Sequence, residues 1–186
     1  MRHISTATST ALILVLACTT DAVGAGRSAT PTDIVVAPGA EGTHERAALI
    51  AAIALLPENP TRVAVMDVTL ARPGVRERLL ELDAFTIKDN GVIYVVKQSE
   101  LLRRAGTGAA VYRAMLATVI WHEMAHLAKA DERAARQAEE QLWTRLLRDG
   151  VTDPITGLRY LAALKNRPDD QLLALGPPVR VGAPAQ

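Results

Sequence analysis

The segment 109–128 constrains the fold more than any other, because it predicts a long apolar helix that carries a pair of histidines. The residues between Arg113 and His122 include no charged side chain. A helix of this composition is expected to be buried on most sides. Glu123 and His126 follow near its carboxyl end. Polar groups in a buried helix are costly unless a shared partner satisfies them.

A metal ion is the partner that the His122-Glu123-x-x-His126 spacing predicts. Residues four apart lie on one face of a helix, so both imidazoles can reach the same cation. Glu123 is displaced around the helix, where its carboxylate can hold a water bound to the ion rather than the ion itself. This division favours hydrolysis, in which the ion lowers the pKa of the water and Glu123 accepts its proton. The alternative interpretation is a solvated polar patch at the end of a helix.

Residues 121–140 resemble the zincins, the His-Glu-x-x-His zinc metallopeptidases. The resemblance implies a Zn²⁺ cofactor with a third protein ligand besides His122 and His126. Four acids follow the motif: Asp131, Glu132, Glu139 and Glu140.

Glu132 is the acid that the resemblance favours as third ligand, with Glu139 as the alternative. Glu132-Arg133-Ala134-Ala135-Arg136 resembles the Glu-x-x-Ala/Ser-Asp segment that carries the third ligand in gluzincins. The step from His126 to Glu132 is also that of the third ligand in metzincins. Two residues depart from these patterns: Arg136 replaces the usual acid of gluzincins, and Lys129 replaces the turn glycine of metzincins.

Glu132 can reach the ion only if the chain turns between Lys129 and Asp131. In one unbroken helix, Glu132 would lie off the face of both histidines. Asp131 is a good N-cap, so we predict separate helices over 109–128 and 131–148. On the second helix Arg136 would share a face with Glu132 and orient it.

The remaining pattern predicts an α+β fold, in which a small sheet with a hairpin packs on a helical bundle carrying the motif. Further helices are expected over 43–56, 73–82, 99–105 and 155–166. Strands are expected over 62–70, 85–88 and 92–96, the last two joined by a turn at Asn90-Gly91.

Other candidate residues have two interpretations each. Val92–Val96 could pair with an extended substrate or be a plain core strand. Tyr160 could stabilise an oxyanion, but packing with its hydroxyl in water is favoured. His44 is expected at the surface, and Trp121 and Trp143 in the core.

The N-terminus resembles an export signal, with Arg2 and His3 before a short apolar run, 11–17. Residues 1–25 would be a signal peptide, or 1–17 if Cys18 is lipidated in the lipobox-like Val15-Leu16-Ala17-Cys18. A flexible arm over 26–42, a zincin-like metallopeptidase domain over 43–166 and a disordered tail over 167–186 would follow.

We therefore expect zinc-dependent peptide-bond hydrolysis outside the cytoplasm. The exported protein itself would be periplasmic or an envelope lipoprotein, or alternatively secreted. The substrate would be a peptide or protein, and the membrane would be contacted only through a lipid on Cys18. Lys plus Arg (21) balance Asp plus Glu (20), which argues against a nucleic-acid partner. The alternatives are a non-catalytic metal-binding lipoprotein, a degenerate zincin that binds a partner, and a purely structural helical envelope protein.

Overall fold

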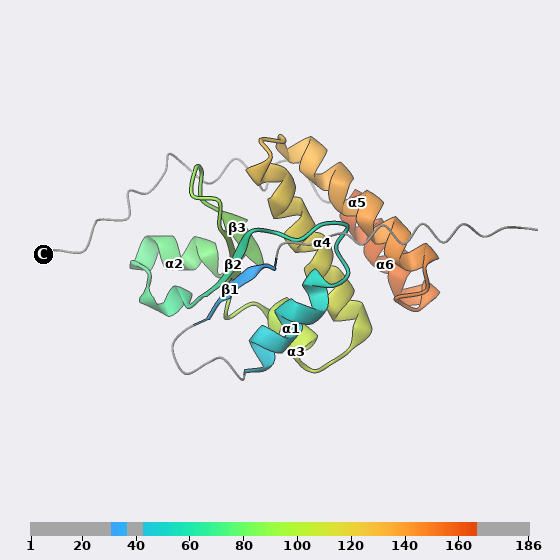
Figure 1. The fold of residues 1–186 in the computed structure, drawn as a ribbon, viewed down its shortest axis with the longest axis horizontal. Helices are drawn as coiled ribbons and strands as arrows, with labels where there is room; N and C mark the ends of the chain where they lie inside the picture. Colours follow the sequence, from blue (N-terminus) through green and yellow to red (C-terminus); the bar gives the residue numbers. More distant parts are fainter. Residues whose placement is uncertain (1–30, 37–42, 167–186) are drawn as a thin grey trace, which may run out of the picture.

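The described part of the chain is an α+β domain, as predicted. The computed structural model describes residues 31–36 and 43–166. Within them are one four-stranded sheet and six α-helices, which lie beside the sheet and on one another (Figure 1). The predicted signal segment with Cys18, most of the arm and the predicted tail lie outside the described residues.

The sheet is mixed and has the strand order β1-β2-β4-β3. β1 pairs parallel with β2, β2 pairs parallel with β4, and β3 pairs antiparallel with β4. The edge strands are therefore β1 and β3. The strand bounds are β1 Asp33–Val35, β2 Arg62–Met66, β3 Ala84–Thr86 and β4 Ile93–Val96.

The helices lie close to the predicted ranges, because side-chain caps fix several of their ends. Ser99, Asp131 and Asp153 each accept a hydrogen bond from a backbone N–H in the first turn that follows. No helix within the described residues is long and apolar enough to cross a membrane. The bounds are α1 His44–Ile53, α2 Pro73–Leu79, α3 Glu100–Gly106, α4 Ala110–Leu127, α5 Glu132–Arg148 and α6 Pro154–Lys165.

The prediction of a flexible arm is wrong for residues 33–35, which form β1. Ile34, in the middle of this strand, packs against the main core cluster. The surrounding residues are rich in Gly, Ala and Pro, so the sequence did not indicate that this short apolar run is a strand. Its pairing with β2 is a long-range contact, which local composition does not indicate.

The predicted strand 62–70 is also too long. It ends at Met66, because the Asp67 carboxylate accepts a hydrogen bond from the Thr69 backbone N–H and starts a 3₁₀ turn, η1 (Val68–Leu70). Similarly, the predicted helix 73–82 ends at Leu79.

The predicted β-hairpin is present, but its turn is wider than expected. Thr86 is paired with Ile93, so residues 87–92 form the connection. Asp89 and Gly91 have the positive φ angles there, at 66° and 65°.

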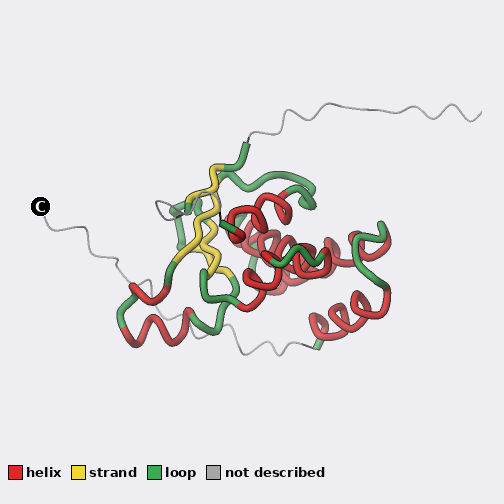
Figure 2. The backbone as a smooth tube through the Cα atoms, turned by 90° about the horizontal axis from the view of Figure 1, so that it is seen from below, coloured by secondary structure: helices red, strands yellow, loops and turns green. Residues whose placement is uncertain are grey.

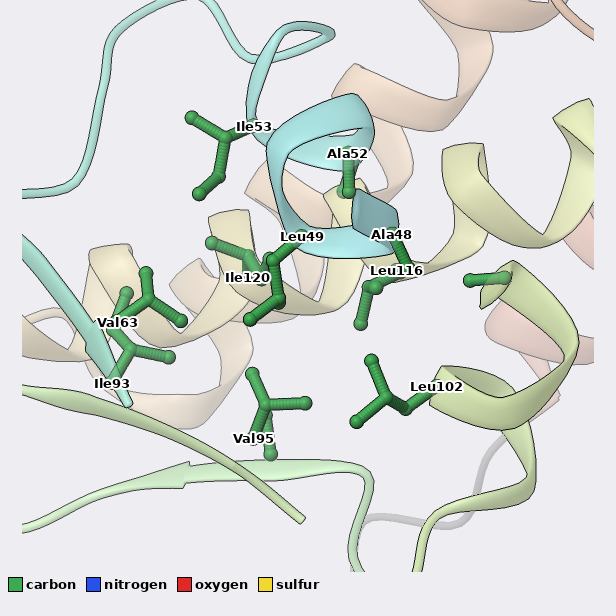
Figure 3. Close-up of a cluster of buried hydrophobic side chains, with 13 residues drawn as sticks. Ala48, Leu49, Ala52, Ile53, Val63, Ile93, Val95, Leu102, Leu116 and Ile120 are labelled. Carbon is green, nitrogen blue, oxygen red and sulfur yellow. The ribbon is translucent and has the colours of Figure 1, made fainter. Parts of the chain in front are cut away.

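Side chains alternate between the two faces of the sheet. Ile93 and Val95 face a core shared with α1, α3 and α4, part of which is drawn in Figure 3. Phe85 and Val96 face the opposite side, where Leu79 of α2 covers them. The tube view in Figure 2 shows the sheet beside this group of helices.

α4 is buried from two sides, as its composition predicts. Leu116 and Ile120 face the sheet core, whereas Ala114 packs in a second core with α5 and α6. Trp143 of α5 is fully buried in that second core, and Trp121 packs against it. Both tryptophans are therefore core residues.

Candidate metal centre

The two histidines of the motif lie together near the carboxyl end of α4. Their Nε2 atoms are 3.1 Å apart, and their rings meet edge to face with centroids 4.8 Å apart. The one-turn spacing on the helix places the rings side by side. Both side chains are partly buried, with 12% exposure for His122 and 26% for His126.

The chain turns immediately after α4, at the place that the third-ligand hypothesis requires. Lys129 adopts a left-handed conformation with φ 67°. Its N–H donates to the His126 carbonyl, and the Ala130 N–H donates to the Ala125 carbonyl. These two bonds form a Schellman motif, which ends a helix and usually has glycine at the left-handed position. The turn is thus made without glycine, and α5 begins three residues later.

The turn brings Glu132, the first residue of α5, to both histidines. One carboxylate oxygen lies 3.1 Å from His126 Nε2, and the other lies 3.5 Å from His122 Nε2. The three side chains place their ligand atoms within 4.8 Å of one another, so this group could hold a metal ion. Arg136 Nε donates to Glu132 at 3.0 Å, which confirms the predicted contact.

His126 is oriented by the turn itself. Its Nδ1 lies 3.1 Å from the Ala130 carbonyl oxygen. A carbonyl can only accept, so Nδ1 is the donor in this contact, and Nε2 faces the group.

His122 is oriented by a side chain of the next helix. Glu139 Oε2 lies 3.2 Å from His122 Nδ1. This distance is short enough for an ion pair, although Nδ1 has no aligned hydrogen-bond partner. We therefore interpret the contact as electrostatic. Burial alone would lower the pKa of His122, but Glu139, with Glu123 and Glu132, outweighs it and raises the pKa.

The alternative ligand, Glu139, is therefore not part of the metal group. It faces Nδ1 on the far side of the His122 ring, whereas the group is formed by the Nε2 atoms. Its side chain is only 2% exposed, and Tyr160 of α6 donates to its other oxygen at 3.3 Å. The expectation that the Tyr160 hydroxyl lies in water is wrong, while the predicted packing of its ring is confirmed by contact with Trp143.

Glu123 lies beside the group, on the side of α4 that meets the sheet. It is 9% exposed, and it lies against Thr86 at the end of β3. Burial raises the pKa of the Glu123 carboxyl, against the opposing effects of His122, His126 and the Thr86 hydroxyl. The carboxylate thus lies between α4 and the sheet, and it is not one of the three grouped ligands.

The remaining candidates lie outside the group. Val92–Val96 includes β4, which lies between β2 and β3 and so has no free edge for a substrate. His44 is exposed at the start of α1, as expected. The sequence analysis missed Thr86 and assigned no supporting role to Glu139. The one available signal was the position of Glu139 on the same helix face as Glu132 and Arg136.

Comparison of the chain with protein-family models, curated proteins and solved structures found no match. The zincin resemblance therefore depends on the motif and on this geometry alone.

Proposed function

We propose that the chain is a zincin-like zinc metallopeptidase of the gluzincin type that acts outside the cytoplasm. The observation that carries the proposal is the turn at Lys129, because it brings Glu132 to both histidines. Two imidazoles and one carboxylate are a donor set of catalytic zinc sites, which leave a fourth position for water.

The group is compact enough to close around a zinc ion. Ligand atoms at zinc bond lengths of about 2.0–2.1 Å in a tetrahedron lie about 3.3 Å from one another. Here the two Nε2 atoms are 3.1 Å apart, and different oxygens of the Glu132 carboxylate lie 3.1 Å from His126 and 3.5 Å from His122, so the carboxylate would turn to offer one oxygen to the ion. Ferrous iron also uses two histidines and a carboxylate. The adjacent Glu123 favours zinc, because a carboxylate base beside the ion serves hydrolysis.

Each residue then has a defined task. Zinc would supply a Lewis acid that lowers the pKa of a water molecule. His122, His126 and Glu132 would hold the ion, and Arg136 would keep the Glu132 carboxylate in place. Glu123 would accept a proton from the attacking water and pass it to the leaving amine.

The edge strand β3 supports a peptide as substrate. It carries Thr86, a neighbour of Glu123, and it lies at the margin of the sheet. An extended peptide that pairs with an edge strand gains backbone hydrogen bonds there. The scissile bond would then pass close to Glu123.

The export proposal depends on the sequence of residues 1–25. Mass spectrometry of the mature protein from the native cell envelope distinguishes lipidation at Cys18 from ordinary signal-peptidase cleavage. An unprocessed N-terminus would contradict the proposal of export.

The test of the proposed activity is a pair of measurements on the purified chain. We expect one bound zinc per chain and hydrolysis of a pool of unstructured peptides. Glu123→Gln should retain the zinc and lose at least about 100-fold in hydrolysis rate, because it removes the base. Glu77→Gln, an exposed position on α2, is the matched control and should keep full activity.

The outcomes separate the alternatives. Iron instead of zinc, or no metal uptake at all, would overturn the proposed zinc centre. Zinc binding without hydrolysis would leave a metal-binding module of the cell envelope. Full activity of Glu123→Gln would exclude Glu123 as the base.

A further inference from the structure

The helix α6 contributes no residue to the metal group, but it contacts the residue that supports one of its histidines. Tyr160 lies near the middle of α6, and its hydroxyl donates to Glu139 Oε1. The other oxygen of Glu139 faces His122 Nδ1. A continuous path of polar contacts therefore leads from α6 through α5 to α4.

The position of α6 against α5 is well defined. Trp143 Nε1 donates to the Gly157 carbonyl at 2.8 Å, and the Tyr160 ring packs edge to face on the Trp143 ring, with centroids 4.4 Å apart. A Cβ at Gly157 would lie 2.4 Å from Leu147 Cδ1 and 2.9 Å from Thr152 Oγ1. Glycine thus permits the close approach that brings Tyr160 to Glu139.

The Glu139 carboxylate must be satisfied inside the protein. It is 2% exposed, and a buried carboxylate is costly unless polar groups satisfy it. Tyr160 occupies Oε1, which directs Oε2 toward His122. Removing the tyrosine hydroxyl takes away one of the groups that fix the terminal torsion of the carboxylate, which is broad and soft.

We propose that Tyr160 is a positioning residue for the metal centre, acting through Glu139 on the orientation of the His122 ring. The tyrosine hydroxyl fixes the carboxylate, and the carboxylate holds the imidazole so that Nε2 faces His126 and Glu132. The packing of α6 on α5 therefore helps to set metal affinity. This inference rests on the proposed function only in that the group binds a metal ion.

The experiment measures Zn²⁺ affinity of the full chain by competition with a chromophoric chelator. Tyr160→Phe keeps the ring on Trp143 and removes only the hydroxyl. We expect it to weaken zinc binding by about 10-fold, as losses of outer-shell partners of metal ligands do. Its Co²⁺-loaded form should also show an altered visible absorption spectrum, which reports ligand geometry directly.

Tyr112→Phe is the matched control. Tyr112 is also a partly buried residue, and its hydroxyl accepts a hydrogen bond from Arg104, but that bond is exposed and belongs to a different part of the fold. We expect its zinc affinity and Co²⁺ spectrum to equal those of the unchanged protein. Both phenylalanine variants should melt within about 5 °C of it in the metal-free state, since each loses one hydrogen bond.

A second variant covers the case in which Tyr160→Phe fails to fold. In Gly157→Ala the added Cβ meets the side chains of Leu147 and Thr152, and we expect it to shift α6 and weaken zinc binding in the same direction without removing a polar group. Unchanged zinc affinity in the folded variants would overturn the inference and leave the proposed function intact. Absence of zinc binding by the unchanged protein would instead overturn the proposed function.

Discussion

The two histidines of the metal group are supported in different ways. His126 Nδ1 is held by the carbonyl of Ala130, four residues along the chain in the turn that ends α4. His122 Nδ1 faces Glu139, a buried carboxylate from the next helix, which in turn is held by Tyr160 from a third helix. One support is local backbone, and the other is a set of side chains that meet only in the folded protein.

This difference predicts that zinc affinity is more sensitive to mutations around His122 than to mutations around His126. No side-chain substitution removes the Ala130 carbonyl, so the support of His126 at Nδ1 depends only on the turn. The orientation of His122 depends on the chemistry of Glu139 and on the packing of α5 against α6. The following predictions test this contrast, beginning with Glu132, the ligand that contacts both histidines.

Removing the shared ligand should have the largest effect. Glu132→Ala leaves two imidazoles and removes the carboxylate that contacts both, so zinc affinity should fall by more than about 100-fold, beyond the loss typical of outer-shell partners. Chelator competition measures this loss, and Asp131→Ala is the neighbouring control, which removes a helix cap without removing a ligand. An equal loss in the two variants would contradict the role of Glu132 as ligand.

Changing the support of His122 should have an intermediate effect. Glu139→Gln keeps the size of the side chain and removes its charge, so zinc affinity should fall about 10- to 100-fold. Glu140→Gln, the next residue on α5, should bind zinc as the unchanged protein does. If the two variants matched in affinity, His122 would not depend on Glu139.

Changing the turn beside His126 should have the smallest effect. Lys129 has φ 67°, which costs a residue with a Cβ about 1–2 kcal/mol and costs glycine little. Glycine also adds freedom to the unfolded chain, which offsets about 0.4–1 kcal/mol of that gain, so Lys129→Gly should raise the free energy of unfolding by about 0.5–1 kcal/mol in a denaturant titration. Zinc affinity should change by less than about 2-fold, because the Ala130 carbonyl stays in place.

Lys88→Gly is the control for this prediction, since Lys88 lies in a loop without a positive φ. It should lower the free energy of unfolding by about 0.4–1 kcal/mol, because glycine adds freedom to the unfolded chain. A loss of stability in Lys129→Gly would mean that the left-handed turn is not present in solution.

The local half of the site could be predicted from the sequence. The spacing of His122 and His126, the N-cap at Asp131 and the pairing of Arg136 with Glu132 all follow from helix geometry over a few residues. The turn was predicted from the requirement that Glu132 reach the ion. The sequence suggested no left-handed residue at Lys129, because lysine does not favour that conformation.

The long-range half could not be predicted in the same way. The contact between Tyr160 and Glu139 spans 21 residues and depends on how α6 packs on α5. The central place of β4 and the existence of β1 depend on strand pairing, which is set by partners distant in sequence. The pattern of apolar residues predicted the helices and the strand over 92–96, but it did not indicate which elements would pack or pair with one another.

The most direct test of the metal centre is anomalous diffraction at the zinc absorption edge from crystals of the zinc-loaded chain. We predict one strong peak enclosed by His122 Nε2, His126 Nε2 and the Glu132 carboxylate. A peak elsewhere, or one coordinated by the histidines with Glu132 turned away, would contradict the three-ligand site.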